Sequence, residues 1–278
     1  MPPAPYGYGS QVSDGVASRT MPTTTVTEVS ITEGAPVQAP HQRRPTLAWW
    51  WLVAASVLVL AIAAAALAIS WLLTRETRTT TYRALGDLAA VHLDLGAADV
   101  EVDGGATAVE VKRVDEFAFG KPSVEHHRIQ DGMLDVSSRC PQQVIGACHA
   151  TYHVTVPDNV PLEIETSSGA IRLAGVRASV QLSSGSGDIT VTGFCGFSLR
   201  AAADAGDVVV ASQCSADRLE VRSRSGAVHA IVPAGRYQID ASSDLGATRV
   251  RGLTQVDDGA FQIQALSGSG DVTVEAAS

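Results

Sequence analysis

The strongest pattern in the chain is a strand–turn–strand unit that recurs between residues 162 and 276. In each unit, apolar and polar residues alternate, a turn of small residues containing glycine follows, and a second alternating stretch comes after the turn. Alternation with a period of two is typical of β-strands whose successive side chains point to opposite faces. The six units occupy residues 162–173, 180–191, 198–210, 219–230, 237–250 and 261–274.

The turn glycines set the period of these units. They are spaced by 18, 19, 20, 20 and 24 residues, and a fixed period near 20 is typical of stacked, quasi-one-dimensional β architectures. We therefore predict an all-β, solenoid-like (β-helix) stack. Glycine at each turn allows positive φ and a close approach of stacked backbones. The turn glycines are Gly169, Gly187, Gly206, Gly226, Gly246 and Gly270.

Less regular β-structure precedes these units. Residues 91–102 repeat the strand–turn–strand pattern, and Asp131-Gly132 between two alternating stretches predicts a hairpin. The predicted β domain therefore covers residues 82–278. Only residues 275–278 follow the last unit, too few to cover it, so we expect an open β edge at which self-association or partner binding can occur.

A different pattern lies before the β domain, where residues 47–73 carry no charge. About twenty helical residues span the ~30 Å hydrocarbon core of a bilayer. Trp49, Trp50 and Trp51 lie at one end and Trp71 at the other, as expected for indoles at the two membrane interfaces. We predict an uncleaved membrane-spanning helix. The alternative is a cleaved signal peptide, which the length of the apolar stretch disfavours.

The segments on either side of this helix are polar. Residues 1–46 contain seven of the twelve prolines and no helical period, which predicts a disordered tail. Residues 74–81 are predicted to form a short polar stalk.

Cysteine placement predicts the orientation. All four cysteines follow the apolar segment, and an even number on one side favours disulfides in an oxidising compartment. The tail is then cytoplasmic and the β domain extracytoplasmic. Cys195 and Cys214 lie one repeat apart, so they would stack on adjacent coils at a separation that suits a disulfide. Cys140 and Cys148 would close a small loop.

Charge and motif spacing argue against several kinds of ligand. The net charge is −9, and residues 74–278 carry all of it with 17 basic against 26 acidic residues, which disfavours nucleic acid. The cysteines and histidines at 140, 148, 149 and 153 match no standard zinc spacing. Asp188, Asp207 and Asp271 follow glycine at a period near twenty, which favours turn capping over calcium-binding nonapeptides. We predict no cofactor, no metal and no catalytic residue.

Two motifs resemble those of a known family. One is Tyr-His-Val-Thr-Val-Pro-Asp-Asn-Val-Pro-Leu at 152–162, and the other is Ser-Gly-Ser-Gly-Asp-Ile/Val-Thr-Val at 184–191 and 267–274. They resemble the bacterial putative-adhesin family of β-strand repeats, a domain of unknown function often joined to a membrane anchor. The resemblance covers residues 88–276, and the anchor, the proline-rich tail and the arginine bias resemble actinobacterial members. It implies the fold but no site residues.

These observations predict a non-enzymatic, single-pass membrane protein whose ectodomain acts as a surface interaction or adhesion module. Its expected partners are the lipid bilayer and a component of the cell envelope or surface. Two alternatives stay open. The chain could be an envelope-stress sensor or regulator that signals through its threonine-rich tail, or a structural spacer without a ligand.

Overall fold

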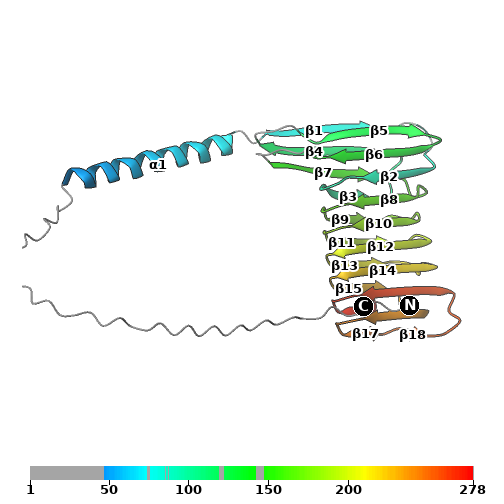
Figure 1. Cartoon of the computed structure of the whole chain (residues 1–278). Coiled ribbons are helices and arrows are strands. Elements are labelled where there is room, and N and C mark those ends of the chain that lie inside the picture. The colour runs from blue at the N-terminus through cyan, green and yellow to red at the C-terminus, as the bar shows by residue number, and fades with distance from the viewer. Residues whose placement is uncertain are drawn as a thin grey trace, which may run out of the picture. The chain divides into compact units, whose positions relative to one another are not determined.

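The structure is a computed structural model of the chain, and it describes residues 47–73, 76–84, 86, 88–118, 122–141 and 147–277 (Figure 1). The predicted tail, residues 1–46, lies outside the described residues. Helix α1 (Leu47–Leu73) matches the predicted apolar helix. Its segment Trp49–Ser70 is long and apolar enough to cross a membrane by length and composition. The side chains of Trp49, Trp50 and Trp51 are exposed, and that of Trp71 lies outside the described residues.

The β domain consists of two ten-stranded sheets whose inward side chains form one hydrophobic core. In spatial order, sheet A contains β1 (Glu76–Arg83), β4 (Glu110–Ala118), β7 (Ala147–Thr155), β3 (Asp99–Asp103), β9 (Ile171–Ala174), β11 (Ile189–Phe194), β13 (Val208–Ser212), β15 (Val228–Val232), β20 (Val272–Ala276) and β17 (Thr248–Arg251). Sheet B contains β18 (Thr254–Gln255), β16 (Arg236–Ser243), β19 (Phe261–Ser267), β14 (Arg218–Ser225), β12 (Ser198–Ala205), β10 (Val180–Ser184), β8 (Leu162–Thr166), β2 (Ala90–Asp94), β6 (Met133–Arg139) and β5 (Val124–Gln130).

We call one strand of sheet B, its glycine turn and the next strand of sheet A a rung. Successive rungs pair in parallel and in register, so equivalent residues stack into columns. One such column in sheet B contains Leu162, Val180, Leu199 and Leu219, all buried. Small branched side chains therefore fill a thin core, and the predicted solenoid-like fold is confirmed.

The rungs do not stack in the order of the sequence. The last unit, β19–β20, lies between β14–β15 and β16–β17. The prediction that the last unit forms the open edge is therefore wrong, because β17 and β18 occupy that end. The reason lies in the inward residues. The fifth unit has the polar Thr248 at the inward position where the last unit has Val272, and the two are in register. The more apolar rung thus has a neighbour on each side.

The other end of the stack consists of antiparallel strands (Figure 1). Strand β1 pairs with β4, and β5 pairs with β6. The β5–β6 turn contains Asp131 and Gly132, both with positive φ, which confirms the predicted hairpin. The structure places residues 76–81 of the predicted stalk in β1, where a run rich in β-branched threonine suits an extended edge strand.

Close approach between rungs explains the turn glycines. A Cβ on Gly187 would overlap the carbonyl oxygen of Gly169, and a Cβ on Gly226 would overlap that of Gly206. The same holds at each of the six predicted turn glycines, whose neighbour is always a backbone atom of the adjacent rung. Among the six, only Gly206 has positive φ, so close stacking and not left-handed backbone is the general reason for glycine here.

Two sets of side-chain hydrogen bonds join the turns of adjacent rungs. The first consists of hydroxyl groups that donate to turn carbonyls: Ser184 to Gly169, Ser223 to Gly206, Ser267 to Gly226 and Ser243 to Gly270, at 2.7–3.2 Å. The second consists of carboxylates that accept a backbone N–H of the next turn: Asp99 from Ala170, Asp188 from Asp207, Asp207 from Ala227 and Asp271 from Ala247, at 2.8–2.9 Å. The predicted turn-capping role of the aspartates is thus confirmed.

The substitution Gly187→Ala tests the close stacking of the turns. Because the added methyl group meets rigid backbone, we expect the free energy of unfolding to fall by about 1–3 kcal/mol, the usual cost of overpacking. The measurement is thermal or denaturant unfolding followed by circular dichroism. Ser186→Ala in the same turn removes an exposed side chain and should leave stability unchanged. Equal stability of both variants would contradict the stacking account.

Candidate interaction surface

A shallow groove of about 720 Å³ lies on the outer face of sheet B. It crosses β6, β2, β8, β10, β12, β14 and β19 near the beginning of each strand. Its floor includes His92, Glu163, Gln181, Arg200 and Glu220, which occupy one outward column because their strands pair in register. Strands in a sheet lie about 4.8 Å apart, so the polar side chains of this column, one on each strand, follow each other at that distance. We call it the sheet B groove.

The polar floor of the groove is ordered by hydrogen bonds along the column. The Gln181 amide donates to Glu163 at 2.9 Å, and Arg200 Nε donates to Glu220 at 2.9 Å. Arg222 Nη2 lies 2.7 Å from the second Glu220 oxygen, and the Glu220 side chain is only 12% exposed. The floor therefore presents hydrogen-bond donors and acceptors in fixed positions. Its acidic and basic side chains are mixed.

Apolar side chains stand at the rim of the groove. Phe197, in the connection before β12, is 66% exposed, and Met133 at the start of β6 is also exposed. The backbone holds Phe197 in place, since its carbonyl accepts the Asp217 N–H at 3.0 Å. Concave surfaces that combine exposed apolar groups with a few placed polar groups are typical of binding sites.

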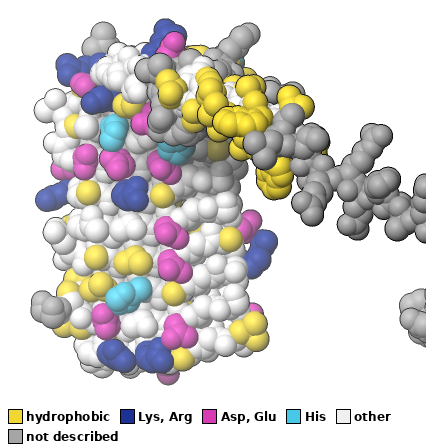
Figure 2. All heavy atoms as spheres, turned by 90° about the vertical axis from the view of Figure 1, so that its left-hand side faces the viewer, with side chains coloured by type: hydrophobic (Ala, Val, Ile, Leu, Met, Phe, Trp, Pro, Cys, Tyr) yellow, Lys and Arg dark blue, Asp and Glu magenta, His cyan; other side chains and the backbone are white. Residues whose placement is uncertain are grey.

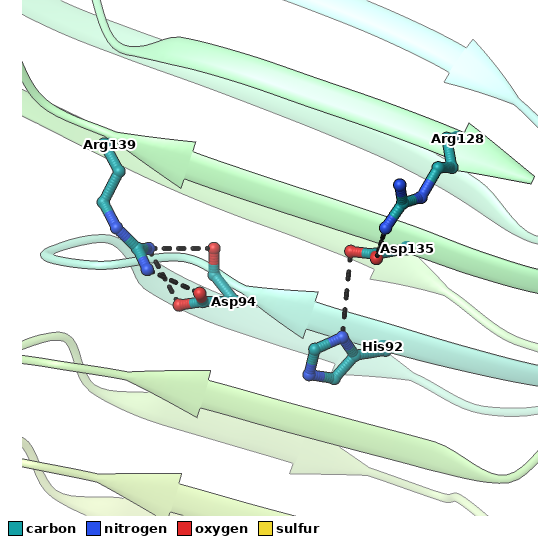
Figure 3. Close-up of polar contacts among 5 residues, drawn as sticks. All are labelled: His92, Asp94, Arg128, Asp135 and Arg139. Atoms are coloured by element: carbon teal, nitrogen blue, oxygen red, sulfur yellow. Dashed lines mark hydrogen bonds and ion pairs between the residues drawn. The ribbon is translucent and has the colours of Figure 1, made fainter.

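Ion pairs lie on the outer face of β5, β6 and β2, and of their residues His92 also lines the groove (Figure 3). Arg139 Nη1 donates to Asp94 Oδ1 at 2.8 Å, and Arg139 Nη2 donates to the second oxygen, so the pair is bidentate and joins β6 to β2. This hydrogen bonding holds the pKa of Asp94 below its usual range. Asp135 accepts from Arg128 at 3.0 Å, and His92 Nδ1 lies 3.7 Å from Asp135 Oδ1. The three strands β5, β6 and β2 are thereby tied across their outer face.

A buried ionic cluster lies where the two sheets meet at the antiparallel end. Arg113 Nε lies 2.8 Å from Asp115, and Arg113 Nη1 lies 3.1 Å from Glu125. Tyr152 donates to Glu125 at 2.9 Å, and Ser123 donates to Asp115. Burial is the main reason that the pKa of the Tyr152 hydroxyl is raised. A lone buried charge is costly, so this arginine between two carboxylates fastens β5 to β4 and β7.

Sequence reasoning missed both the groove and this cluster. The cluster has a visible signal, because Arg113 and Asp115 interrupt the inward apolar positions that begin with Val111. The groove has none, since its residues come from seven strands and are separated by up to 172 positions between Ala90 and Gln262.

Comparisons with known proteins were made on sequence and on structure. Residues 151–278 match the family model described as Toastrack DUF4097. Over these residues the chain is similar to the Toastrack family. No curated protein matches the chain.

Several solved structures are similar to the chain over about three quarters of its length. A "putative cell adhesion protein" from Clostridium sporogenes has 11% identity and a TM-score of 0.47, over 73% of this chain and 100% of its own. A "putative adhesin" from Bacteroides fragilis has 10% identity and a TM-score of 0.43, over 73% and 97%. A "putative lipid binding protein" from Parabacteroides distasonis has 11% identity and a TM-score of 0.31, over 74% and 97%. Likeness at this level says nothing about function.

The fold of the β domain brings the four cysteines together in the predicted pairs. Cys140 is joined to Cys148, with a Cα separation of 6.0 Å, and Cys195 is joined to Cys214, with a Cα separation of 4.8 Å. The second bond connects the loops that follow β11 and β13 on adjacent rungs. His149 and His153 instead lie near Asp99 and Glu101. Among the described residues, no group of three or more His, Cys, Asp or Glu side chains is placed to hold a metal.

Charge on the domain surface is mixed. Over the face shown in Figure 2, acidic, basic, apolar and neutral side chains are interspersed along the stack, and no broad basic area is visible. Binding of the phosphate backbone of a nucleic acid needs a basic patch, so this face offers nothing for such a partner.

The Asp94–Arg139 pair predicts a pH dependence. A carboxylate whose pKa is lowered by folding stabilises the fold above its unfolded pKa, and this contribution is lost as pH falls through the folded pKa. We expect Asp94→Asn to lower the free energy of unfolding by about 0.2–1 kcal/mol at pH 7, since the pair is partly exposed. The difference should shrink below about pH 4.

Urea unfolding at several pH values measures this effect. Asp258→Asn, at an exposed loop position, is the matched control and should be neutral throughout. A loss of stability in Asp94→Asn that stays constant down to low pH would count against a charge interaction.

Proposed function

We propose that this protein is a membrane-anchored, non-enzymatic interaction module. In this proposal α1 crosses the membrane, residues 1–46 are cytoplasmic, and the β domain binds a component of the cell envelope or surface through the sheet B groove. The observation that carries it is the groove itself, in which an exposed aromatic ring stands beside an ordered row of donors and acceptors on a rigid parallel sheet.

The chemistry of α1 supports the anchor. Its 27 residues carry no charge, and nearly all described side chains are exposed. Such a surface is unfavourable in water and favourable in hydrocarbon. The hydroxyl of Ser56 donates to the Val53 carbonyl at 2.8 Å, which satisfies a polar group that lipid could not. Two disulfides in the β domain favour an oxidising compartment and hence an extracytoplasmic location.

The rigidity of the groove supports binding. Its floor lies on strands held by parallel ladders on both sides, so a partner would not have to order it. Binding to a preorganised surface avoids the entropic cost of fixing loops and side chains. The mixed charge of the floor favours a partner that both donates and accepts hydrogen bonds, and Phe197 supplies an apolar contact.

The substitution Phe197→Ala tests this function. Aromatic side chains in a binding site often contribute more than 1 kcal/mol, so we expect the affinity of the full chain for isolated cell envelope to fall about tenfold. The measurement is a saturation binding assay with the chain in lipid nanodiscs. Thr190→Ala, on the outer face of sheet A, should leave binding unchanged.

The other outcomes separate the alternatives. Saturable binding that Phe197→Ala does not change would indicate that the partner binds to a surface other than the groove. No binding by a correctly folded chain would contradict the interaction module and favour the regulator or the spacer. A spacer further predicts that charge reversal at exposed positions such as Arg222 and Arg224 changes no phenotype.

A further inference from the structure

We propose that two copies of this chain pair end to end through the open rung, which consists of β16, β17 and β18. In the pair, β17 of one copy lies antiparallel beside the uncovered half of β16 of the other copy, and the twofold axis repeats this contact. The two stacks then form one longer stack.

The open rung has unpaired strand edges. Strand β17 pairs with β20 on one side, and within the described residues no strand pairs with its other side. Strand β18 pairs with β16 only at Arg236 and Tyr237. The side-chain amide of Gln255 donates a hydrogen bond to the backbone carbonyl of Ile239. Residues 240–243 of β16 therefore also have a free edge. Free edges of this kind are ready templates for another strand.

Apolar side chains are exposed at the same end. Val250 is in register with the buried Val274, yet it is 39% exposed because no further rung covers it. Leu245, in the turn of the open rung, is 83% exposed. A second copy would cover these side chains as a further rung does elsewhere in the stack.

Charge selects the arrangement of the two copies. Arg249 and Arg251 point to the outer face of sheet A, as do their partners Thr273 and Glu275, whereas Asp240 points to the outer face of sheet B in register with Gln264. Arg249 is paired with Asp271 at 2.9 Å, so Arg251 is the cation that the sheet A edge offers to a second copy. On β16, Arg236 lies in the half that β18 covers, and Asp240 lies in the uncovered half. A twofold axis parallel to the strands places the sheet A edge of one copy against the sheet B edge of the other, so Arg251 of each copy faces Asp240 of the other.

The alternative twofold axis is unfavourable. An axis perpendicular to the sheets would place the two β17 strands side by side, with Arg249 and Arg251 of one copy beside the same residues of the other. Like charges directly opposite each other in a sheet are destabilising. Strands of the two sheets run in opposite directions within a rung, so the favoured arrangement also gives an antiparallel ladder, which needs no crossover connection.

The pairing would place the two N-terminal ends far apart. Strand β1, which follows α1 in the sequence, is the outermost strand of sheet A at the opposite end of the stack from β17. In the pair, the two β1 strands thus lie at opposite ends of the joined stack. Together with the proposed membrane anchor, on which this step rests, such a pair would connect two facing membranes.

Charge reversal tests the pairing. Arg251 forms no ion pair with another described residue, so Arg251→Glu removes an interaction with a second copy and not one within the chain. We expect the full chain in detergent to dimerise in sedimentation velocity experiments, and Arg251→Glu to weaken the dimer at least tenfold. Combining it with Asp240→Arg should restore the affinity, because the charges are then exchanged across the contact. Arg177→Glu, on a loop away from the open rung, is the control.

The outcomes are decisive either way. A chain that is monomeric at every concentration overturns the proposal, and so does a dimer that Arg251→Glu leaves unchanged, since pairing would then use another surface such as α1. Circular dichroism spectra confirm that each variant is folded. Envelope binding is tested separately at Phe197, so failure of the pairing does not count against the groove, nor the reverse.

Discussion

The close contact between the turns of adjacent rungs is the constraint on which the rest of the domain depends. Each rung can lie one strand spacing from the next only if the backbone of its turn touches the backbone of its neighbour. A side chain at Gly187 or Gly226 would occupy the position of the neighbouring carbonyl. Once the turns are in contact, the serine hydroxyls and aspartate carboxylates lie within hydrogen-bonding distance of the neighbouring turn. Both sets of hydrogen bonds between turns therefore depend on that spacing.

The two ends of the stack differ in how the edges of the parallel strands are covered. At the antiparallel end, β1 and β5 cover the parallel ladders, and the cluster around Arg113 fastens the β5–β6 hairpin between the sheets. At the other end, a rung with exposed inward residues forms the boundary. A natural protein usually protects such an edge with charge, bulges or a partner. Here β17 carries Arg251 on the outer face of sheet A, and the uncovered half of β16 carries Asp240 on the outer face of sheet B, which disfavours contact between two β17 strands and permits contact between β17 and β16.

The outer face of sheet B carries a groove whose polar floor is ordered by hydrogen bonds. Parallel register lines up polar side chains from strands far apart in the sequence, and Phe197 adds an apolar rim. The mixed signs of Glu163, Arg200 and Glu220 do not attract one class of charged ligand. They favour recognition through directed hydrogen bonds, which is the behaviour expected of an interaction surface that selects by shape and hydrogen-bond pattern.

The sequence by itself determined the local structure of this protein. Alternation predicted the strands, the glycine period predicted the stacked turns, the uncharged stretch 47–73 predicted the helix, and the one-repeat spacing of Cys195 and Cys214 predicted their bond. These features depend on residues within one or two rungs of each other, so they can be predicted from the local pattern of the sequence.

Only the tertiary structure decided the order of the rungs, the closed and open ends, and the groove. The last unit lies inside the stack, where Val272 and Val274 are buried, and no periodic signal in the sequence records this order. The buried pairing of Arg113 with Asp115 and Glu125, and the groove floor from His92 to Glu220, arise from residues brought together by strand pairing across the whole domain. Such contacts depend on global register, which is a property of the folded stack and not of any one segment.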